Sequence, residues 1–246
     1  MATFVLVHGS WHGGWCWRKV TPLLRAAGHE VYTPTLTGLG ARAHLLTGGV
    51  DLTTHIQDIV SLLFYEDLAE VVLVGHSYAG VVISGVAART PERLASLIYL
   101  DAYLPMEGQS LFDVLSPEER EAGQAALATG MGLRQPVPPA ILGITDPTMA
   151  AWVAARLTPH PFSTYAQAIP VGIPVSAALP RAFIHCTAGP TAPRFATFAQ
   201  QARAAGWAVR ELATGHDAML TAPQPLVELL LELGGLAEPG TGADTQ

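Results

Sequence analysis

Short apolar runs alternate with helical patterns along most of this chain, and this alternation limits its fold more than any other feature. Runs of β-branched and other apolar residues predict strands, and the segments between them repeat apolar positions at helical spacing. Such an alternation predicts an α/β protein with a mostly parallel central sheet and helices on both faces. Strands are predicted at 3–7, 30–33, 69–74, 94–100, 181–186 and 208–212, and helices at 17–27, 52–65, 77–89, 193–205 and 223–233.

One segment interrupts the alternation. Residues 103–180 are rich in proline and contain two further predicted helices, at 117–128 and 148–157. Because the segment is too long for a simple crossover, we expect an inserted, mainly helical cap; two crossover helices with long loops are the alternative. The predicted division is a first core part at 1–102, the cap at 103–180, a second core part at 181–236 and a flexible tail at 237–246.

The sequence GHSYAG at positions 75–80 stands between a predicted strand and a predicted helix. In a strand–turn–helix of this kind, the central serine occupies a sharp, strained turn that exposes its hydroxyl at the end of the sheet. Small flanking residues let the strand and the helix pass close together. Ser77 is therefore the candidate nucleophile. An ordinary serine in a tight turn is the alternative, since Ala79 stands where such motifs carry a second glycine.

A serine hydroxyl needs a base to accept its proton, and His216 is the best-placed histidine. It lies between the last predicted strand and the last predicted helix, and so at the same sheet edge as Ser77. A carboxylate must then orient the imidazole, yet no acidic residue occurs between Asp146 and Glu211. Asp101 directly follows a predicted strand, so we predict the catalytic residues Ser77, Asp101 and His216.

The other acidic residues near these segments are weaker candidates. Asp113, Glu118, Glu119 and Glu121 lie in the predicted cap, where a solvated helix face is the simpler interpretation. Asp217 is adjacent to the base, and its side chain would point away from the imidazole that it would have to orient.

Attack on an acyl group creates an oxyanion, which requires preorganised N–H donors. We predict the backbone amide of Tyr78, directly after the nucleophile, and that of Ser10, in the Gly-rich loop after the first strand. A Gly-rich turn without a ligand role is the alternative for that loop. Some of the aromatic residues could line an apolar pocket, and Trp11 and Trp152 are taken as candidate substrate-binding residues.

The Gly-rich loop also raises the question of a metal or a phosphate. His8 and His12 have the spacing of metal ligands on a helix, but the glycines disfavour a helix and no acidic third ligand is near. No Gly-Lys-Ser/Thr follows, which excludes a phosphate-binding P-loop. We therefore predict neither a metal site nor a cofactor.

The composition excludes several classes of function. Charged residues make up 13% of the chain and the net charge is -7, which argues against disorder and against nucleic-acid binding. No apolar run is long enough to span a bilayer, and no signal peptide is recognisable. The two cysteines, Cys16 and Cys186, indicate no disulfide framework. We expect a soluble, cytoplasmic protein that acts on a small molecule, of an oligomeric state that the sequence does not define.

Four segments carry a resemblance to a known family: FVLVHGSWHGGWCW from Phe4, PTLTGLGARAHL from Pro34, VLVGHSYAGVV from Val72 and GHDAMLTAPQPL from Gly215. The chain resembles the α/β-hydrolase superfamily, and within it the branch of plant methylesterases, hydroxynitrile lyases and their small bacterial esterase relatives. The resemblance implies an α/β-hydrolase fold, with Ser77 and His216 in catalytic roles and an oxyanion hole formed by Ser10 and Tyr78.

Two departures limit what the resemblance transfers. The plant relatives carry their acid in the loop that here reads TAG at 187–189, so Asp101 must replace it. The hydroxynitrile lyases need a threonine at the position of Gly9 and a lysine at that of Asp217, so cyanohydrin cleavage is disfavoured.

We therefore predict a serine hydrolase of carboxylic esters, or of thioesters or lactones, with an apolar small-molecule substrate and an acyl-enzyme intermediate. One alternative is a biosynthetic enzyme that uses the same site for ring-forming or C–C bond chemistry, because a fold does not determine a function. The other is a ligand-binding receptor with little turnover.

Overall fold

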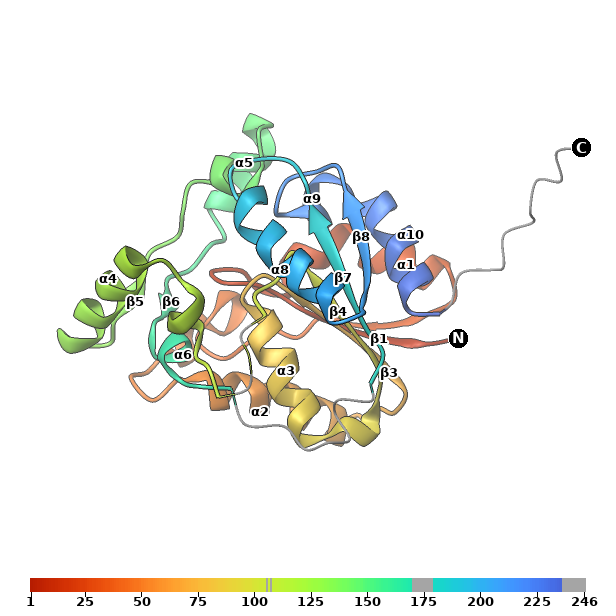
Figure 1. The fold of residues 1–246 in the computed structure, drawn as a ribbon, viewed down its shortest axis with the longest axis horizontal. Helices are drawn as coiled ribbons and strands as arrows, with labels where there is room; N and C mark the ends of the chain where they lie inside the picture. Colours follow the sequence, from red (N-terminus) through yellow and green to blue (C-terminus); the bar gives the residue numbers. More distant parts are fainter. Residues whose placement is uncertain (105, 107, 170–178, 236–246) are drawn as a thin grey trace, which may run out of the picture.

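A six-stranded, wholly parallel sheet forms the centre of the molecule, with the strand order β2-β1-β3-β4-β7-β8 (Figure 1). The structure is a computed structural model that describes residues 1–104, 106, 108–169 and 179–235. The predicted α/β class is confirmed, and every predicted strand is present to within two residues at each end. The strands are β1 (Thr3–Val7), β2 (Glu30–Tyr32), β3 (Val71–His76), β4 (Leu94–Leu100), β7 (Arg181–Cys186) and β8 (Ala208–Leu212).

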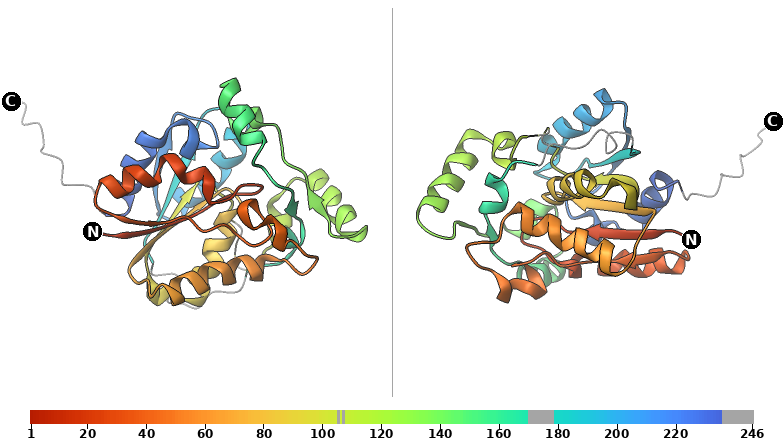
Figure 2. Two further views of the ribbon diagram at one scale, coloured as in Figure 1. Left: turned by 180° about the vertical axis from the view of Figure 1, so that it is seen from behind. Right: turned by 90° about the horizontal axis from the view of Figure 1, so that it is seen from below.

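Alternate side chains of each strand enter separate hydrophobic cores on the two faces of the sheet. In β1, Val5 and Val7 join the core beneath α2, α3 and α8, whereas Phe4 and Leu6 join the core beneath η1, α1, α9 and α10. Helices α1 and α10 lie side by side on the second face (Figure 2, left). The helices are η1 (Gly14–Lys19), α1 (Thr21–Ala26), η2 (Gly40–Leu45), α2 (Leu52–Tyr65), α3 (Ala79–Arg89), η3 (Pro91–Arg93), α8 (Ala192–Ala204), α9 (Ala218–Thr221) and α10 (Pro223–Leu233).

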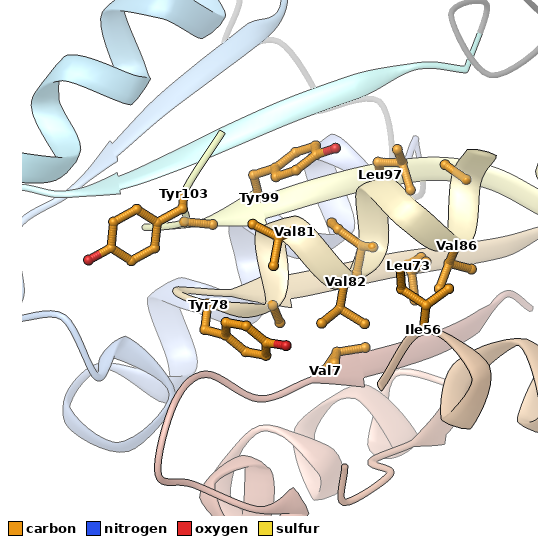
Figure 3. Close-up of a cluster of buried hydrophobic side chains, with 14 of the residues drawn as sticks. Val7, Ile56, Leu73, Tyr78, Val81, Val82, Val86, Leu97, Tyr99 and Tyr103 are labelled. Carbon is orange, nitrogen blue, oxygen red and sulfur yellow. The ribbon is translucent and has the colours of Figure 1, made fainter. Parts of the chain in front are cut away.

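The first core fixes α3, the helix that begins just after Ser77. Val82 of α3 and Leu73 of β3 are fully buried in one cluster with Ile56 of α2 (Figure 3). Burial of each such side chain stabilises the fold by about 1.5–3 kcal/mol. Helices α2 and α3 also approach closely, because a Cβ at Gly85 would lie only 2.2 Å from Ile56 Cδ1. The end of β3 and the start of α3 are therefore held rigidly.

The segment between β4 and β7 forms small elements that gather at one end of the sheet (Figure 1). Helix α4 has the predicted bounds, whereas α5 begins one residue earlier and ends three residues earlier than predicted. The short antiparallel pair β5–β6 was not predicted from the sequence. The elements are η4 (Leu111–Val114), α4 (Pro117–Ala128), β5 (Leu133–Arg134), η5 (Pro139–Leu142), α5 (Pro147–Ala154), β6 (His160–Pro161) and α6 (Ser163–Ala166).

Parts of the predicted cap, at 170–178, and the whole predicted tail, at 237–246, lie outside the described residues. Among the residues that are described, no helix has the length and apolar character needed to cross a membrane.

Candidate active site

Ser77 occupies the sharp turn between β3 and α3. Its φ of 55° lies in the left-handed region, which non-glycine residues adopt only at an energetic cost. The turn is held by its backbone: the Ser77 amide donates to the Leu100 carbonyl, and the Ser77 carbonyl accepts from the amides of Gly80 and Tyr103, each at 3.1 Å. A strained turn held by several contacts is the backbone geometry predicted for a nucleophile at the end of a strand.

Glycines permit the close approach of three segments at this turn. A Cβ on Gly75 would lie 2.8 Å from the carbonyl oxygen of Ala79, so the strand and the helix could not pass as closely with a larger residue. A Cβ on Gly9 would lie 2.8 Å from Ser77 Cβ. The loop after β1 therefore reaches the serine because position 9 has no side chain.

Asp101 and His216 form a buried pair at the same edge of the sheet. His216 Nδ1 lies 2.7 Å from Asp101 Oδ2 and donates to it, since a carboxylate only accepts. The other carboxylate oxygen accepts from the Cys186 amide at 3.0 Å, and the Asp101 amide donates to the Ile184 carbonyl at 2.7 Å. The ring of Phe195 stacks on the imidazole, with ring centroids 4.7 Å apart. The carboxylate and the imidazole are thus fixed in orientation.

Ser77 and His216 line one cavity of about 310 Å³. The cavity lies between the ends of the strands and the segment inserted between β4 and β7. Its wall is part apolar and part charged, and it also includes the predicted residues Ser10 and Trp11. The remaining lining residues are Tyr103, Glu119, Arg134, Val137, Ile141, Leu142, Pro190, Thr191, Arg194 and Phe195.

The two tryptophans proposed to bind substrate lie in different places. Trp11 lines the cavity, and its indole N–H donates to the backbone carbonyl of Arg134 at 3.0 Å. Trp152 is not among the cavity's lining residues. It packs against Trp15, and the guanidinium groups of Arg18 and Arg156 lie over its ring at 5.0 and 4.2 Å. The structure therefore brings Trp11, but not Trp152, to the candidate site.

A second buried aspartate–histidine pair lies behind the site. Asp217 Oδ2 accepts from His12 Nε2 at 3.0 Å, and the other ring nitrogen of His12 is 2.7 Å from the Ser10 carbonyl. Both partners are acceptors, so His12 makes both hydrogen bonds only as an imidazolium. Burial opposes that charge, but the Asp217 carboxylate outweighs it and raises the pKa of His12 above its usual 6.5. The pair links the loop of Ser10 to the loop of His216.

His8 and His76 are buried in a different state. His8 donates from Nδ1 to the Gly9 carbonyl at 2.8 Å and accepts the Leu36 amide at Nε2, at 3.0 Å. Burial lowers the pKa of His8 to about 3, so the ring is neutral. Burial also holds the pKa of His76 well below 6.5, and its Nε2 donates to the His216 carbonyl at 3.0 Å. In the described part of the chain, no group of three or more His, Cys, Asp or Glu side chains could hold a metal ion.

The charged wall of the cavity was not predicted from the sequence. Glu119 was interpreted as part of a solvated helix face, but it lines the cavity and forms ion pairs with Arg134 of β5 and Arg194 of α8. Arg134 also donates a hydrogen bond of 3.0 Å to the Tyr165 hydroxyl. The same hydroxyl forms a hydrogen bond of 2.5 Å with Ser10 Oγ. Only the docking of α4 and β5 against α8 reveals these contacts, since no local pattern marks them.

Comparison with known proteins then places the chain in a family. Residues 4–229 match the model of the alpha/beta hydrolase family. This chain belongs to that family. A carbendazim-hydrolysing esterase from Nocardioides sp. is 42% identical to it over 244 residues, which cover 95% of this chain and 100% of that protein. Methylesterase 1 of Arabidopsis thaliana is 37% identical over 113 residues, or 42% of this chain and 40% of that protein.

Solved structures agree with the family assignment. An extracellular alpha/beta-hydrolase from a Paenibacillus species, described as sharing structural and functional homology with tobacco salicylic acid binding protein 2, superposes with a TM-score of 0.83. It is 25% identical and covers 95% of this chain and 99% of its own. An Arabidopsis methylesterase superposes with a TM-score of 0.76 at 23% identity, covering 96% of this chain and 100% of its own, and supports the fold alone. The predicted α/β-hydrolase fold and the predicted class of carboxylic ester hydrolase are confirmed.

Proposed function

We propose that the protein hydrolyses small carboxylic esters through an acyl-enzyme on Ser77, with His216 as the base and Asp101 as the acid that orients it. The observation that carries the proposal is the 2.7 Å contact between Asp101 and His216, whose imidazole faces the same cavity as Ser77. Nδ1 of His216 donates to Asp101, so Nε2 is the nitrogen available to take the proton of Ser77.

The oxyanion formed by attack of Ser77 is proposed to bind the backbone amides of Ser10 and Tyr78. In support, neither amide has a hydrogen-bond acceptor among the described residues. Two buried contacts orient Ser10: its carbonyl accepts from His12, and its hydroxyl bonds to Tyr165. Donors held in advance of the reaction stabilise the developing charge without reorganisation.

The imidazolium then protonates the leaving alcohol, and the acyl group remains on Ser77. Water enters in place of the alcohol, His216 takes one of its protons, and the resulting hydroxide attacks the acyl carbonyl. The acid leaves as Ser77 recovers its proton from His216. Asp101 stabilises the imidazolium at both steps and stays ionised. Nothing in the described residues favours a non-hydrolytic reaction or a receptor without turnover.

The proposed substrates are small esters with a short alcohol, methyl esters and methyl carbamates included. The names of the relatives point in this direction, since one hydrolyses carbendazim, a methyl carbamate, and others are methylesterases. The cavity of about 310 Å³ is at the small end of the range for ligand pockets. Trp11, Leu142 and Phe195 give the cavity an apolar wall. Of the two candidate substrate-binding tryptophans, Trp11 and Trp152, Trp11 is therefore the one proposed to contact substrate.

We further propose that residues 103–180 act as a cap over the sheet's functional edge, between core parts at 1–102 and 181–236. In support, the segment contributes Glu119, Arg134 and Leu142, among others, to the cavity wall. A cytoplasmic location is proposed on the basis of Cys16 and Cys186, which are both buried and unpaired.

The test is hydrolysis of a panel of p-nitrophenyl and methyl esters by wild type and by Ser77→Ala. We expect wild-type turnover, and at least a 10⁴-fold lower kcat for the variant, roughly the size of the effect of removing a catalytic-triad residue. Circular dichroism and thermal unfolding confirm that the variant is folded. Turnover that survives in a folded Ser77→Ala protein would contradict the assignment of the nucleophile.

A further inference from the structure

Three charged side chains stand in the wall of the cavity that Ser77 lines: Glu119 of α4, Arg134 of β5 and Arg194 of α8. The two guanidinium groups share one carboxylate. Arg194 binds both of its oxygens, at 3.0 and 2.9 Å, and Arg134 reaches it through a longer contact of 3.3 Å. Among the described lining residues of this wall, two positive charges therefore face one negative charge, which leaves one positive charge in excess.

Arg134 is the more buried of the two cations. Its side chain is 19% exposed, compared with 41% for Arg194. The guanidinium lies 4.7 Å from the centre of the Trp11 ring and donates to the Tyr165 hydroxyl. Because solvent screens a buried charge poorly, an anion that entered the cavity would interact with Arg134 more strongly than with an exposed arginine.

Tyr103 adds a hydrogen-bond donor to the same wall. Its hydroxyl oxygen accepts from Arg194 at 3.0 Å, so its own proton is free to point elsewhere. No acceptor for that proton is found among the described residues. Since Tyr103 lines the cavity, a ligand oxygen is the acceptor that this arrangement can serve.

We propose that Arg134, Arg194 and the Tyr103 hydroxyl form a subsite for an anionic group, so that the preferred substrates are esters with a carboxylate distant from the scissile bond. This inference rests on the proposed ester hydrolysis and specifies its substrate class. A guanidinium matches a carboxylate in charge and geometry. The whole chain carries a net charge of -7, so its overall field repels anions and the preference must come from this wall.

The test compares monomethyl esters of four- to six-carbon dicarboxylic acids with the methyl esters of the matching half-amides. The two substrates of each pair have nearly the same shape and differ in the charge of one terminal group. We expect a kcat/KM at least about 10-fold higher for the acid of the best pair, the discrimination that one charge-assisted hydrogen bond provides. The preference should fall as the salt concentration rises.

Variants of the wall should move this ratio in opposite directions. Arg134→Met removes the buried positive charge, and we expect the acid-to-amide ratio to fall towards one. Glu119→Gln removes the negative charge that the described residues contribute to the wall, and we expect the ratio to rise. Arg210→Met is the matched control, because it removes one positive charge from the exposed Arg210–Glu232 pair, and it should leave the ratio unchanged.

Other results of these assays would contradict either the anionic subsite or the proposed function. If wild type hydrolyses the half-amides as fast as the acids, or if Arg134→Met slows both equally, the anionic subsite is wrong while the proposed function stands. Should Arg134→Met fail to fold, a ratio in Glu119→Gln that does not rise would overturn the subsite by itself. If no ester in either series, nor p-nitrophenyl acetate, is hydrolysed in a Ser77-dependent way, the proposed function is wrong, and this inference fails with it.

Discussion

Two buried aspartate–histidine pairs near the candidate site differ in how each histidine uses its two ring nitrogens. His216 is held by Asp101 through Nδ1 and faces the cavity, and its Nε2 has no partner among the described residues. His12 is held by Asp217 through Nε2, and its Nδ1 is bound to the Ser10 carbonyl. The same two residue types thus leave one imidazole nitrogen open to the cavity in the first pair and form a link between two loops in the second. What decides the role is whether the second ring nitrogen is free to exchange a proton.

The largest expected effect separates the pairs at once. Asp101→Asn should lower kcat by about 10⁴-fold, the loss found when the acid of a serine-protease triad is changed in this way, because the amide no longer favours the correct imidazole tautomer. Steady-state kinetics with a p-nitrophenyl ester measure the change. A loss below 10-fold in a folded variant would show that Asp101 is not the acid.

The matching change in the second pair should affect stability more than catalysis. Asp217→Asn removes the counter-charge of His12 in a fully buried site, and breaking a buried pair costs about 3–5 kcal/mol of unfolding free energy. We expect a drop of up to about 10²-fold in kcat from the displaced Ser10 loop. Urea unfolding and kinetics on the same protein test both. A loss of activity equal to that of Asp101→Asn, without loss of stability, would make Asp217 a catalytic acid.

The pH dependence of stability provides a further contrast. The pKa of His12 is raised in the fold. Its contribution to the free energy of unfolding is therefore complete below pH 6.5 and is lost as the pH rises through the raised pKa. Burial lowers the pKa of His8 to about 3 and that of His55, a buried residue of α2, to about 4. Both rings are therefore neutral in the fold, and the free energy of unfolding decreases as the pH falls from 6.5 towards those values.

Urea unfolding of wild type and His12→Gln between pH 4 and 9 measures these effects. In wild type, we expect the free energy of unfolding to decrease at both alkaline and acid pH. The variant should lack the part of the alkaline decrease that His12 causes and should keep the acid decrease. An unchanged alkaline side would show that His12 is not held as an imidazolium by Asp217.

The smallest expected effect concerns the second contact to Ser10. Tyr165→Phe removes the hydrogen bond to Ser10 Oγ and an acceptor for Arg134, and should lower kcat/KM by roughly 2- to 10-fold, the value of one hydrogen bond. Tyr99→Phe is the matched control, because it removes a partly buried hydrogen bond to Ser84 away from the cavity. Equal kinetic losses in the two variants would assign Tyr165 a purely structural role.

The part of this molecule that obeys local rules was predictable from the sequence. The four central strands β1, β3, β4 and β7 were predictable, because each is a mostly apolar run of the kind that a buried parallel strand requires. The turn at Ser77 was predictable as well. Asp101 was selected as the candidate acid by elimination, since the loop after β7 has no acid. The structure places Asp101 beside His216, and its role as the catalytic acid stays a prediction.

The contacts between distant segments were not predictable. Glu119 and Ser116 form a capping box at the N-terminus of α4. This pattern explains Glu119 without any further partner and is compatible with a solvated helix face. Its ion pairs with Arg134 and Arg194 depend on how α4 packs against β5 and α8, which periodicity does not encode. The contact of His12 with Asp217 was not predictable either, because the two residues are distant in the sequence. The loop after β8 brings Asp217 next to His12 only in the folded protein.

The central claim is that Ser77 carries the acyl group during turnover. The most direct measurement is acid quenching of the enzyme during hydrolysis of p-nitrophenyl acetate, followed by mass spectrometry of its peptides. We predict acetyl groups on the peptide that contains Ser77, formed at the rate of the initial burst of p-nitrophenol and absent from Ser77→Ala. Acetyl groups only on another residue, or Ser77-independent turnover, would contradict the account.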